Sequence, residues 1–523
     1  MKTRRGSLRK FNSGWLGAVM ALALLLPSGA RAGDPARSAE LFDQAAAELD
    51  LHGDMFVYFQ IENLVEGLLG KFKAAMERVA QQDDSAAEAA DVFRRLDAFL
   101  RGQGLYDGVS VGLSSKPRPD GLFEVKSFIG RRPAENEPLF WRMLGGAPRA
   151  LRVLDLLPAD AALVVSADIQ PADIWAFLQA AVREVGSEQA HEEMRAAVDE
   201  LKTSAGADLD ALLASLSGEL AVSVQLSKEK TLPLPLGEEG IEVPEPSLLI
   251  AIGVKDDSLM QLLLTLLGGS GLTFEEQQTG GATLHVSPAV AEAPFPLQPA
   301  LAQHEGFLLA GSTPDVLAQA VAVLGGAPGL KAEAGFQALT QGLPAEHNGL
   351  TFIDERLKAA AYEIQRGAIR GDMDEEEAEL TLELMDLFFG WSMKGSVASV
   401  RVVKPTGLLT HSVTPTGGRE VLLLGAAMPA GMLAAITIPS FTRARSHAQH
   451  AQMINTLRLV DAAKQQWALE ESKNDGEEVT EADIEPYLRP GSLALPPGHT
   501  LTINPLGEDP VITRPDGTQI TLP

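Results

Sequence analysis

The sequence predicts an α+β protein: repeated units of antiparallel sheet with packed helices, followed by a long helix and a small antiparallel sheet. Two observations predict it. Short apolar strands separated by turn residues alternate in a recurring order with helix-period stretches over the first four hundred residues. Near the C-terminus, a helical stretch with one apolar face precedes three short strand-like runs. Paired strands that follow helices favour antiparallel sheets over parallel βαβ units.

The N-terminus has the three parts of a cleavable export signal. The first fifteen residues carry five bases and no acid, Leu16–Leu26 is apolar, and an Ala-Arg-Ala motif ends at Ala32. We therefore expect residues 1–32 to be a signal peptide cleaved between Ala32 and Gly33. The mature protein would then be exported, to the periplasm or another extracytoplasmic site. Thr3–Arg9 is a partial twin-arginine signal, so the twin-arginine and general secretory routes both stay open.

Charge and composition limit the classes of partner. The net charge is −27, and removing the six bases of residues 1–32 leaves −33 on the mature chain. Such an acidic chain repels phosphate backbones, so we expect no nucleic-acid partner. With 45% apolar and 22% charged residues, the chain has enough apolar material for packed cores. It contains no cysteine, so its stability outside the cytoplasm depends on packing rather than on disulfides.

Three segments share the order strand, two helices, paired strands. They define α+β repeat units at residues 33–155, 156–328 and 329–418, and we expect helices on one face of each unit's sheet. The predicted strands are 55–59, 108–113, 121–125, 162–168, 219–226, 247–254, 350–353, 396–403 and 407–413. The predicted helices are 63–79, 90–101, 173–185, 192–213, 356–365 and 374–389. The middle unit is expanded by a helix after Lys255 and a hairpin at Phe274–Val286.

A glycine-proline motif supports the repeat. Leu144–Pro148 and Leu324–Pro328 are both Leu-Gly-Gly-Ala-Pro, and each ends a predicted helix. Each is followed by Leu-Pro-Ala, at Leu157–Ala159 and Leu343–Ala345. The strand that begins from the first Leu-Pro-Ala resembles a family of exported bacterial proteins of unknown function, over about residues 150–350. That resemblance implies no catalytic residues.

The longest apolar run begins the C-terminal part. Val421–Phe441 has 21 uncharged residues. Its second half, Gly431–Phe441, is followed by the basic step Arg443-Ala444-Arg445 and resembles the membrane-embedded half of the first helix of a type IV pilin or type II secretion pseudopilin. The similarity continues to Gly507 through Ala462–Glu470 and the Thr500–Pro505 segment. It implies a soluble headpiece in which a long stem helix leans on a small antiparallel sheet.

The residue pattern independently predicts the parts of this headpiece. Apolar residues recur at steps of four, three, three and four, which is one face of a helix; they are Met453, Leu457, Val460, Ala463 and Trp467. Thr480 followed by Asp483 is a helix-start signature. Short strands are predicted at 499–504, 510–513 and 518–522.

The residue types of the pilin processing motif do not occur at the expected positions. Gly418 and Leu422 stand where the family has phenylalanine and glutamate, so we expect no cleavage by prepilin peptidase. We predict a transmembrane or pilin-like helix at 419–442 and a pseudopilin-like headpiece at 443–523, because 21 apolar residues suffice to span a bilayer. The residues that mark this helix are Val421, Gly431, Pro439 and Phe441. The alternative is a buried helix packed on the repeat units.

Bases that follow the apolar run bear on its topology. Arg443 and Arg445 come just after it, which by the positive-inside rule favours a cytoplasmic C-terminus. A headpiece built for the envelope would then face the cytoplasm, so the side on which it lies stays open.

Motifs for metal binding are incomplete. His191-Glu192 begins like a zinc-protease helix, but Arg195 stands where the second histidine is needed. His447 and His450 are spaced to share a helix face, yet no third ligand follows at a suitable distance. The acids from Asp372 to Glu377 run consecutively into a helix start instead of alternating around a calcium loop. We therefore predict no metal site.

Motifs for catalysis are incomplete as well. Ser227–Lys230 fits the Ser-x-x-Lys pattern of penicillin-recognising enzymes, but the companion motifs are missing and the segment lies where a strand passes into a proline-rich loop. No phosphate loop, nucleophile elbow or dinucleotide fingerprint occurs. We predict no catalytic residues and no cofactor, and therefore a protein that is not an enzyme.

These observations favour a non-enzymatic exported cell-envelope protein with a structural or interaction role. It would be membrane-anchored, and its partners would be envelope proteins of a pilus-like or type II secretion system. The alternative is a periplasmic ligand-binding or chaperone-like module anchored by the pilin-like tail. A hydrolase whose site is not visible in sequence is the third hypothesis. The sequence leaves the ligand and the oligomeric state open.

Overall fold

The computed structural model describes two units, within residues 1–425 and 426–523, and each is considered by itself. The described residues are 35–61, 67, 70–74, 77–78, 84–234, 236, 240–269, 271–290, 293, 295–419, 453–471, 473–474, 476–488, 500–514 and 518–522.

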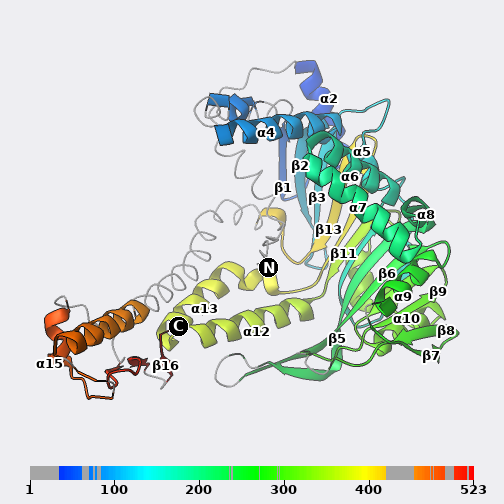
Figure 1. The fold of residues 1–523 in the computed structure, drawn as a ribbon. Coiled ribbons are helices and arrows are strands. Elements are labelled where there is room, and N and C mark those ends of the chain that lie inside the picture. Colours follow the sequence, from blue (N-terminus) through cyan, green and yellow to red (C-terminus); the bar gives the residue numbers. More distant parts are fainter. Residues whose placement is uncertain are drawn as a thin grey trace. The chain divides into compact units, whose positions relative to one another are not determined.

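One antiparallel sheet of 13 strands organises the first unit (Figure 1). Its strand order is β1-β2-β3-β13-β12-β11-β4-β5-β6-β10-β9-β8-β7. The strands are β1 (Met55–Gln60), β2 (Gly108–Pro117), β3 (Phe123–Arg131), β4 (Ala161–Asp168), β5 (Leu216–Leu234), β6 (Ile241–Val254), β7 (Glu275–Thr279), β8 (Ala282–Val286), β9 (Ala300–His304), β10 (Phe307–Gly311), β11 (Gly349–Ile353), β12 (Val397–Lys404) and β13 (Gly407–Thr414). With this sheet and its helices, the predicted α+β class is confirmed.

The segments predicted as three repeat units meet edge to edge in this sheet. Each contributes a first strand and, after its helices, a hairpin: β1 with β2–β3, β4 with β5–β6, and β11 with β12–β13. The last unit lies between the other two, because β13 pairs with β3 and β11 pairs with β4. The sequence predicts a sheet in each unit, whereas the structure has one sheet. Joining the edges satisfies backbone donors and acceptors that three small sheets would leave unpaired.

Helices connect the strands. The described helices of the first unit are α2 (Pro35–Ala46), α4 (Asp84–Gly102), α5 (Leu139–Met143), α6 (Pro171–Val185), α7 (Glu188–Ala205), α8 (Leu209–Ser215), α9 (Ser258–Gly269), α10 (Pro314–Leu324), α11 (Ala334–Thr340), α12 (Glu355–Asp372) and α13 (Glu375–Phe389). The prediction of a single helix over 192–213 is wrong. Gly206 ends α7 in the left-handed conformation, with φ of 65°, and the Asp208 side chain starts α8 by accepting from the Ala211 amide.

The predicted proline-rich loop after Ser227 is also wrong. Beyond an irregular stretch, Thr231–Leu234 of β5 pairs again with Ile241–Pro244 of β6, so the hairpin continues past the sheet. Helices α12 and α13 pack as a pair, and an added Cβ at Gly367 of α12 would meet Leu236 and Ile241 at the hairpin's end. The hairpin extension therefore has helical support.

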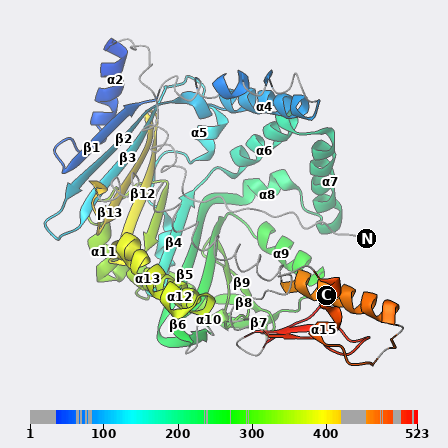
Figure 2. The ribbon, with the colours of Figure 1, turned by 90° about the vertical axis from the view of Figure 1, so that its left-hand side faces the viewer.

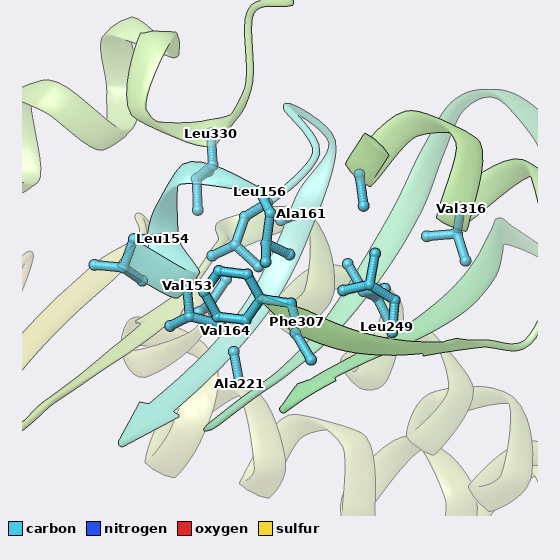
Figure 3. Packing of buried hydrophobic residues seen from close by; sticks show 14 of the residues in the cluster. Val153, Leu154, Leu156, Ala161, Val164, Ala221, Leu249, Phe307, Val316 and Leu330 are labelled. Carbon is cyan, nitrogen blue, oxygen red and sulfur yellow. The ribbon is translucent and has the colours of Figure 1, made fainter. Parts of the chain in front are cut away.

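The sheet has a covered face, on which helices and turns pack, and an open face on its other side. On the covered face, α10, α11 and the turns η2 (Arg152–Asp155) and η3 (Leu330–Ala332) bury a continuous core (Figure 3). Leu156, Val164 and Leu309 in this core are each 0% exposed. Helix α2 packs on the same face at β1–β3.

The open face is made by the residues that alternate with this core. At one end α9 covers it, where Met260 packs with Leu301 and Leu308. Helices thus lie on both faces, and the expectation that they lie on one face is wrong, because the wide sheet has apolar side chains on both. Helices α4, α5 and α6 pack chiefly on one another, and Figure 2 shows α4, α6 and α7 set apart from the strands.

The second unit is a helix packed on a small sheet. Its stem helix, residues 453–471, lies against β14 (Thr500–Thr502), β15 (Val511–Thr513) and β16 (Gln519–Ile520), and α15 (Glu481–Ile484) adds a short turn. The predicted apolar stripe of the stem helix is confirmed, since Met453, Leu457, Val460, Ala463 and Trp467 are all buried. The predicted helix start is confirmed too: Thr480 and Asp483 form a reciprocal capping box.

Candidate functional site

A buried ionic cluster lies where β4 ends and β5 begins. Nη2 of Arg149 donates to Oδ1 of Asp168 at 2.8 Å, and Nη1 donates to Oε1 of Glu219 at 2.7 Å. The other Glu219 oxygen accepts from the Val153 amide at 2.8 Å. The two carboxylates are only 5% and 4% exposed, and the hydrogen bond to Asp168 is the main cause that raises the pKa of Arg149. Every charge is paired, so the cluster fastens the segment before β4 to the sheet.

Asn348 lies beside this cluster, at the same ends of the central strands. Its Nδ2 donates to the Gly146 carbonyl at 2.9 Å, and its Oδ1 accepts from the Val403 amide at 2.8 Å. Gly145 has φ of 134°, and a Cβ there would lie 2.7 Å from Asn348 Nδ2. The first Leu-Gly-Gly-Ala-Pro motif therefore serves close backbone approach as well as helix termination. In the second copy, the equivalent glycine is Gly325, where an added Cβ would meet the carbonyl oxygens of Ala322 at 3.3 Å and Val321 at 3.5 Å, both at the end of its own helix.

A groove of about 1040 Å³ lies beside α10, between the β5–β6 hairpin and the segment before β4. Asp160 lines it, and its Oδ1 is buried with no hydrogen-bond partner among the described residues. Burial is the main cause that raises the pKa of this carboxyl. The groove's lysines are engaged with acids: Lys228 lies 3.8 Å from Glu333, and Lys230 lies 3.9 Å from Glu245.

Ser227–Lys230 borders this groove but does not form a nucleophile and base. The Ser227 hydroxyl accepts from the Glu229 amide at 3.2 Å and from the Lys230 amide at 2.9 Å, which holds the chain in a turn. The Lys230 ammonium points to Glu245 instead of Ser227. The lining mixes amides, hydroxyls and aliphatic groups and can hold a polar ligand.

The other sequence candidates lie apart from this groove. His191 is on α7, with Nδ1 2.7 Å from the Ser187 carbonyl oxygen, and Arg195 is exposed. In the acid cluster, Asp374 caps α13 by accepting from the Glu377 amide at 3.0 Å, so the helix-start interpretation is confirmed. Within the described ranges, no three His, Cys, Asp or Glu side chains are grouped to hold a metal.

Several predictions fall outside the described residues. They concern the cleavage site at Ala32 and Gly33, the histidines His447 and His450, and the membrane helix marked by Val421, Gly431, Pro439 and Phe441. Among the helices that are described, none is long and apolar enough to cross a bilayer. Gly418, just before the apolar run, is described: its amide donates to the Ser115 hydroxyl at 2.9 Å.

The second unit has a buried lysine that clamps a loop. Lys464 of the stem helix is 1% exposed, and its Nζ donates to the carbonyl oxygens of Pro505 at 2.9 Å and Glu508 at 2.7 Å. Burial lowers the pKa of this ammonium. A smaller groove of about 490 Å³ lies beside it, lined in part by Asp461 and Asp509. The lysine therefore joins the stem helix to the loop before β15.

Sequence reasoning missed Arg149, Glu219, Asn348 and Lys464. Each is a single polar residue without a local motif, and its partners lie tens to hundreds of residues away in the chain. Leu-Gly-Gly-Ala-Pro was the one signal near Asn348. No family model matches the chain, and neither curated proteins nor solved structures give a match.

Proposed function

We propose that this protein is an exported, non-enzymatic component of the bacterial cell envelope with a structural or interaction role. The observation that carries the proposal is the second unit. Its stem helix buries one apolar stripe on a three-stranded antiparallel sheet, which is the arrangement that the pilin or pseudopilin resemblance implies. The signal-like N-terminus, ending at Ala32, supports export.

The proposed location is extracytoplasmic, with the apolar segment 419–442 as the membrane anchor. The exposed side of the stem helix supports an interaction role, since Leu459 is 48% exposed and Leu469 is 83% exposed. The proposed partners are envelope proteins of a pilus-like or type II secretion system.

Location and topology are tested together by thiol labelling in the native host. The chain has no cysteine, so Val165→Cys in the sheet and Leu469→Cys in the stem helix each introduce a single thiol. With an impermeant maleimide on intact spheroplasts, we expect Val165→Cys to react. A membrane span at 421–441 predicts that Leu469→Cys reacts only after lysis.

Two outcomes would contradict parts of the proposal. Reaction of Leu469→Cys without lysis means that both units are outside, and the span is then abandoned. Protection of both variants until lysis, together with an N-terminus at Met1 in the purified protein, rules out export.

A periplasmic ligand-binding module is the second candidate function. It is favoured by the open face of the sheet, where Val165 is 45% exposed and Leu248 is 38% exposed. Soluble proteins seldom leave contiguous aliphatic surface uncovered without a binding role.

A further inference from the structure

The open face of the sheet is aliphatic and accessible. Neighbouring residues of β4 show the contrast, since Val164 on the covered face is 0% exposed and Val165 on the open face is 45% exposed. On β6, Leu249 is 1% exposed and Leu248 is 38% exposed. Cross-strand pairing places Val222 beside Val165 and Ile250 beside Val222, so the exposed Val165 and the half-buried Val222 and Ile250 form a continuous aliphatic row over β4, β5 and β6.

Arg401 on β12 is a charged residue of this face. Ala398 and Val400 of β12 belong to the core of the covered face, so Arg401 has the opposite orientation. Its direct cross-strand neighbours are Thr410 on β13 and Gly349 on β11. An added Cβ at Gly349 would lie 3.5 Å from an Arg401 guanidinium nitrogen. The guanidinium therefore lies close against the backbone of Gly349.

Hydroxyl groups lie in the next row along the strands. Ser399 pairs with Ser412 on one side and Thr351 on the other, and the Ser412 hydroxyl donates to the Ser399 hydroxyl at 2.8 Å. Thr351 pairs in turn with Val165. The face thus changes from a cation with hydroxyls on β11–β13 to aliphatic groups on β4–β6.

The charge of Arg401 has no counterion among the described residues. Its hydrogen-bond partner there is the Asn348 carbonyl oxygen, at 3.4 Å, and its Nε is buried without any partner. Burial lowers the pKa of this guanidinium, and no acidic neighbour acts against that effect. Arg149, by contrast, has two carboxylates within 2.8 Å. An unpaired, partly desolvated cation is costly unless an anion joins it.

We propose that the open face binds a long-chain fatty acid, with its carboxylate on Arg401 and its acyl chain over the aliphatic side chains of β4–β6. A guanidinium matches a carboxylate with two parallel hydrogen bonds. From β12 to β6 there are four strand intervals, or about 19 Å, which is room for an extended chain. A single cation with small hydroxyl neighbours suits a singly charged head group.

This inference deepens the ligand-binding candidate and is independent of the envelope-anchoring role. Fatty-acid binding is measured on purified protein, whereas anchoring is measured by labelling in cells. A negative result for fatty-acid binding would not contradict the proposed anchoring, and a negative result for anchoring would not contradict fatty-acid binding.

The test uses the purified mature chain, residues 33–523, and palmitate as the probe in calorimetric titrations. We expect binding that strengthens with each methylene from octanoate to palmitate, by up to about fourfold, the value for a fully buried methylene. Hexadecan-1-ol, which has the chain without the charge, should bind at least tenfold more weakly than palmitate.

Variants assign the two halves of the site. Arg401→Gln should weaken palmitate at least tenfold and remove its advantage over hexadecan-1-ol, and Arg401→Lys should recover part of the loss. Val165→Asp should abolish binding of both probes. Arg183→Gln, on the exposed side of α6, is the matched control and should bind as the parent does.

Three results would overturn the proposal. The first is the absence of palmitate binding at millimolar concentration. The second is an equal affinity for palmitate in the parent protein and in the Arg401→Gln and Val165→Asp variants. The third is binding to phosphatidylglycerol vesicles without binding to palmitate. If Arg401→Gln does not fold, the comparison of palmitate with hexadecan-1-ol on the parent protein decides the role of the charge. Equal affinity for the two probes then contradicts it.

Discussion

The covered and open faces of the sheet are made by the same strands and differ in what lies on them. Along β13, buried and half-buried residues alternate strictly from Gly407 to Thr414. The covered face is packed by segments from far along the chain, including η2 and α10. The open face keeps α9 at one end and leaves Val165 and Leu248 accessible. Alternation in a strand therefore specifies two faces without specifying which one is covered.

The two faces also differ in whether their arginine side chains are paired with carboxylates. At the covered side, Arg149 is paired with Asp168 and Glu219, which leaves each charge satisfied. On the open face, Arg401 lacks a carboxylate partner among the described residues. Paired buried charges indicate a structural role, and an unpaired one indicates a ligand.

The largest expected effect is the difference in stability loss between two leucine-to-alanine variants, one on each face. Leu309→Ala, on the covered face, should lower the unfolding free energy by about 3 kcal/mol, because it leaves a cavity in the core. Leu248→Ala, on the open face, should cost less than about 1 kcal/mol. Urea unfolding of both variants measures the contrast. Equal losses would mean that the open face is packed as tightly as the other.

A smaller but still large loss is expected at the ionic cluster. Arg149→Met leaves two buried carboxylates without their cation and should cost about 3 kcal/mol, or somewhat less because Arg149 itself is 40% exposed. Arg183→Met breaks an exposed pair, with Glu184, and should stay within about 0.5 kcal/mol of the parent. The same urea titration at pH 7 compares the two variants. Similar small losses of unfolding free energy in both would contradict the role of Arg149 in fastening the segment before β4 to the sheet.

The third effect is a pH dependence that arises from two buried imidazoles. Burial is the main cause that lowers the pKa values of His347 and His411 below the ordinary 6.5. The unfolded state then binds more protons than the folded state just below pH 6.5, so stability falls as the pH decreases through that region. The limit is about 1.4 kcal/mol per histidine per pH unit. Charges facing His411 include Lys126, Glu124, Asp50 and Arg118.

Urea titrations between pH 5 and pH 7.5 measure this dependence. The double variant His347→Gln, His411→Gln should flatten the slope between pH 6.5 and pH 5. An unchanged slope in the double variant would show that other groups cause the dependence.

Much of the local structure follows from the sequence. The strand predicted at 162–168 is β4, and the stripe Met453, Leu457, Val460, Ala463 and Trp467 is buried as expected, since periodicity reports which residues share a face. The missed features are long-range. The edge pairings β13–β3 and β11–β4 leave no local signature, because an edge strand and an inner strand have the same alternation.

The candidate sites were harder to predict for the same reason. Glu219 lies 70 residues from Arg149 in the chain, and Arg401 is one polar residue in an alternating strand, Ser396–Val403. Only the structure shows that the first charge is paired and that the second has no carboxylate partner in the described part of the chain. Composition alone would assign Arg401 to a solvated face.

The difference between the two faces is tested most directly with two single cysteines in this cysteine-free chain. Val164→Cys and Val165→Cys are adjacent on β4, nearly conserve side-chain volume, and point to opposite faces. With a soluble maleimide under native conditions, Val165→Cys should react at a rate close to that of the unfolded chain, and Val164→Cys should be protected at least a thousandfold. Equal protection of both thiols would contradict an open face, and the fatty-acid site with it.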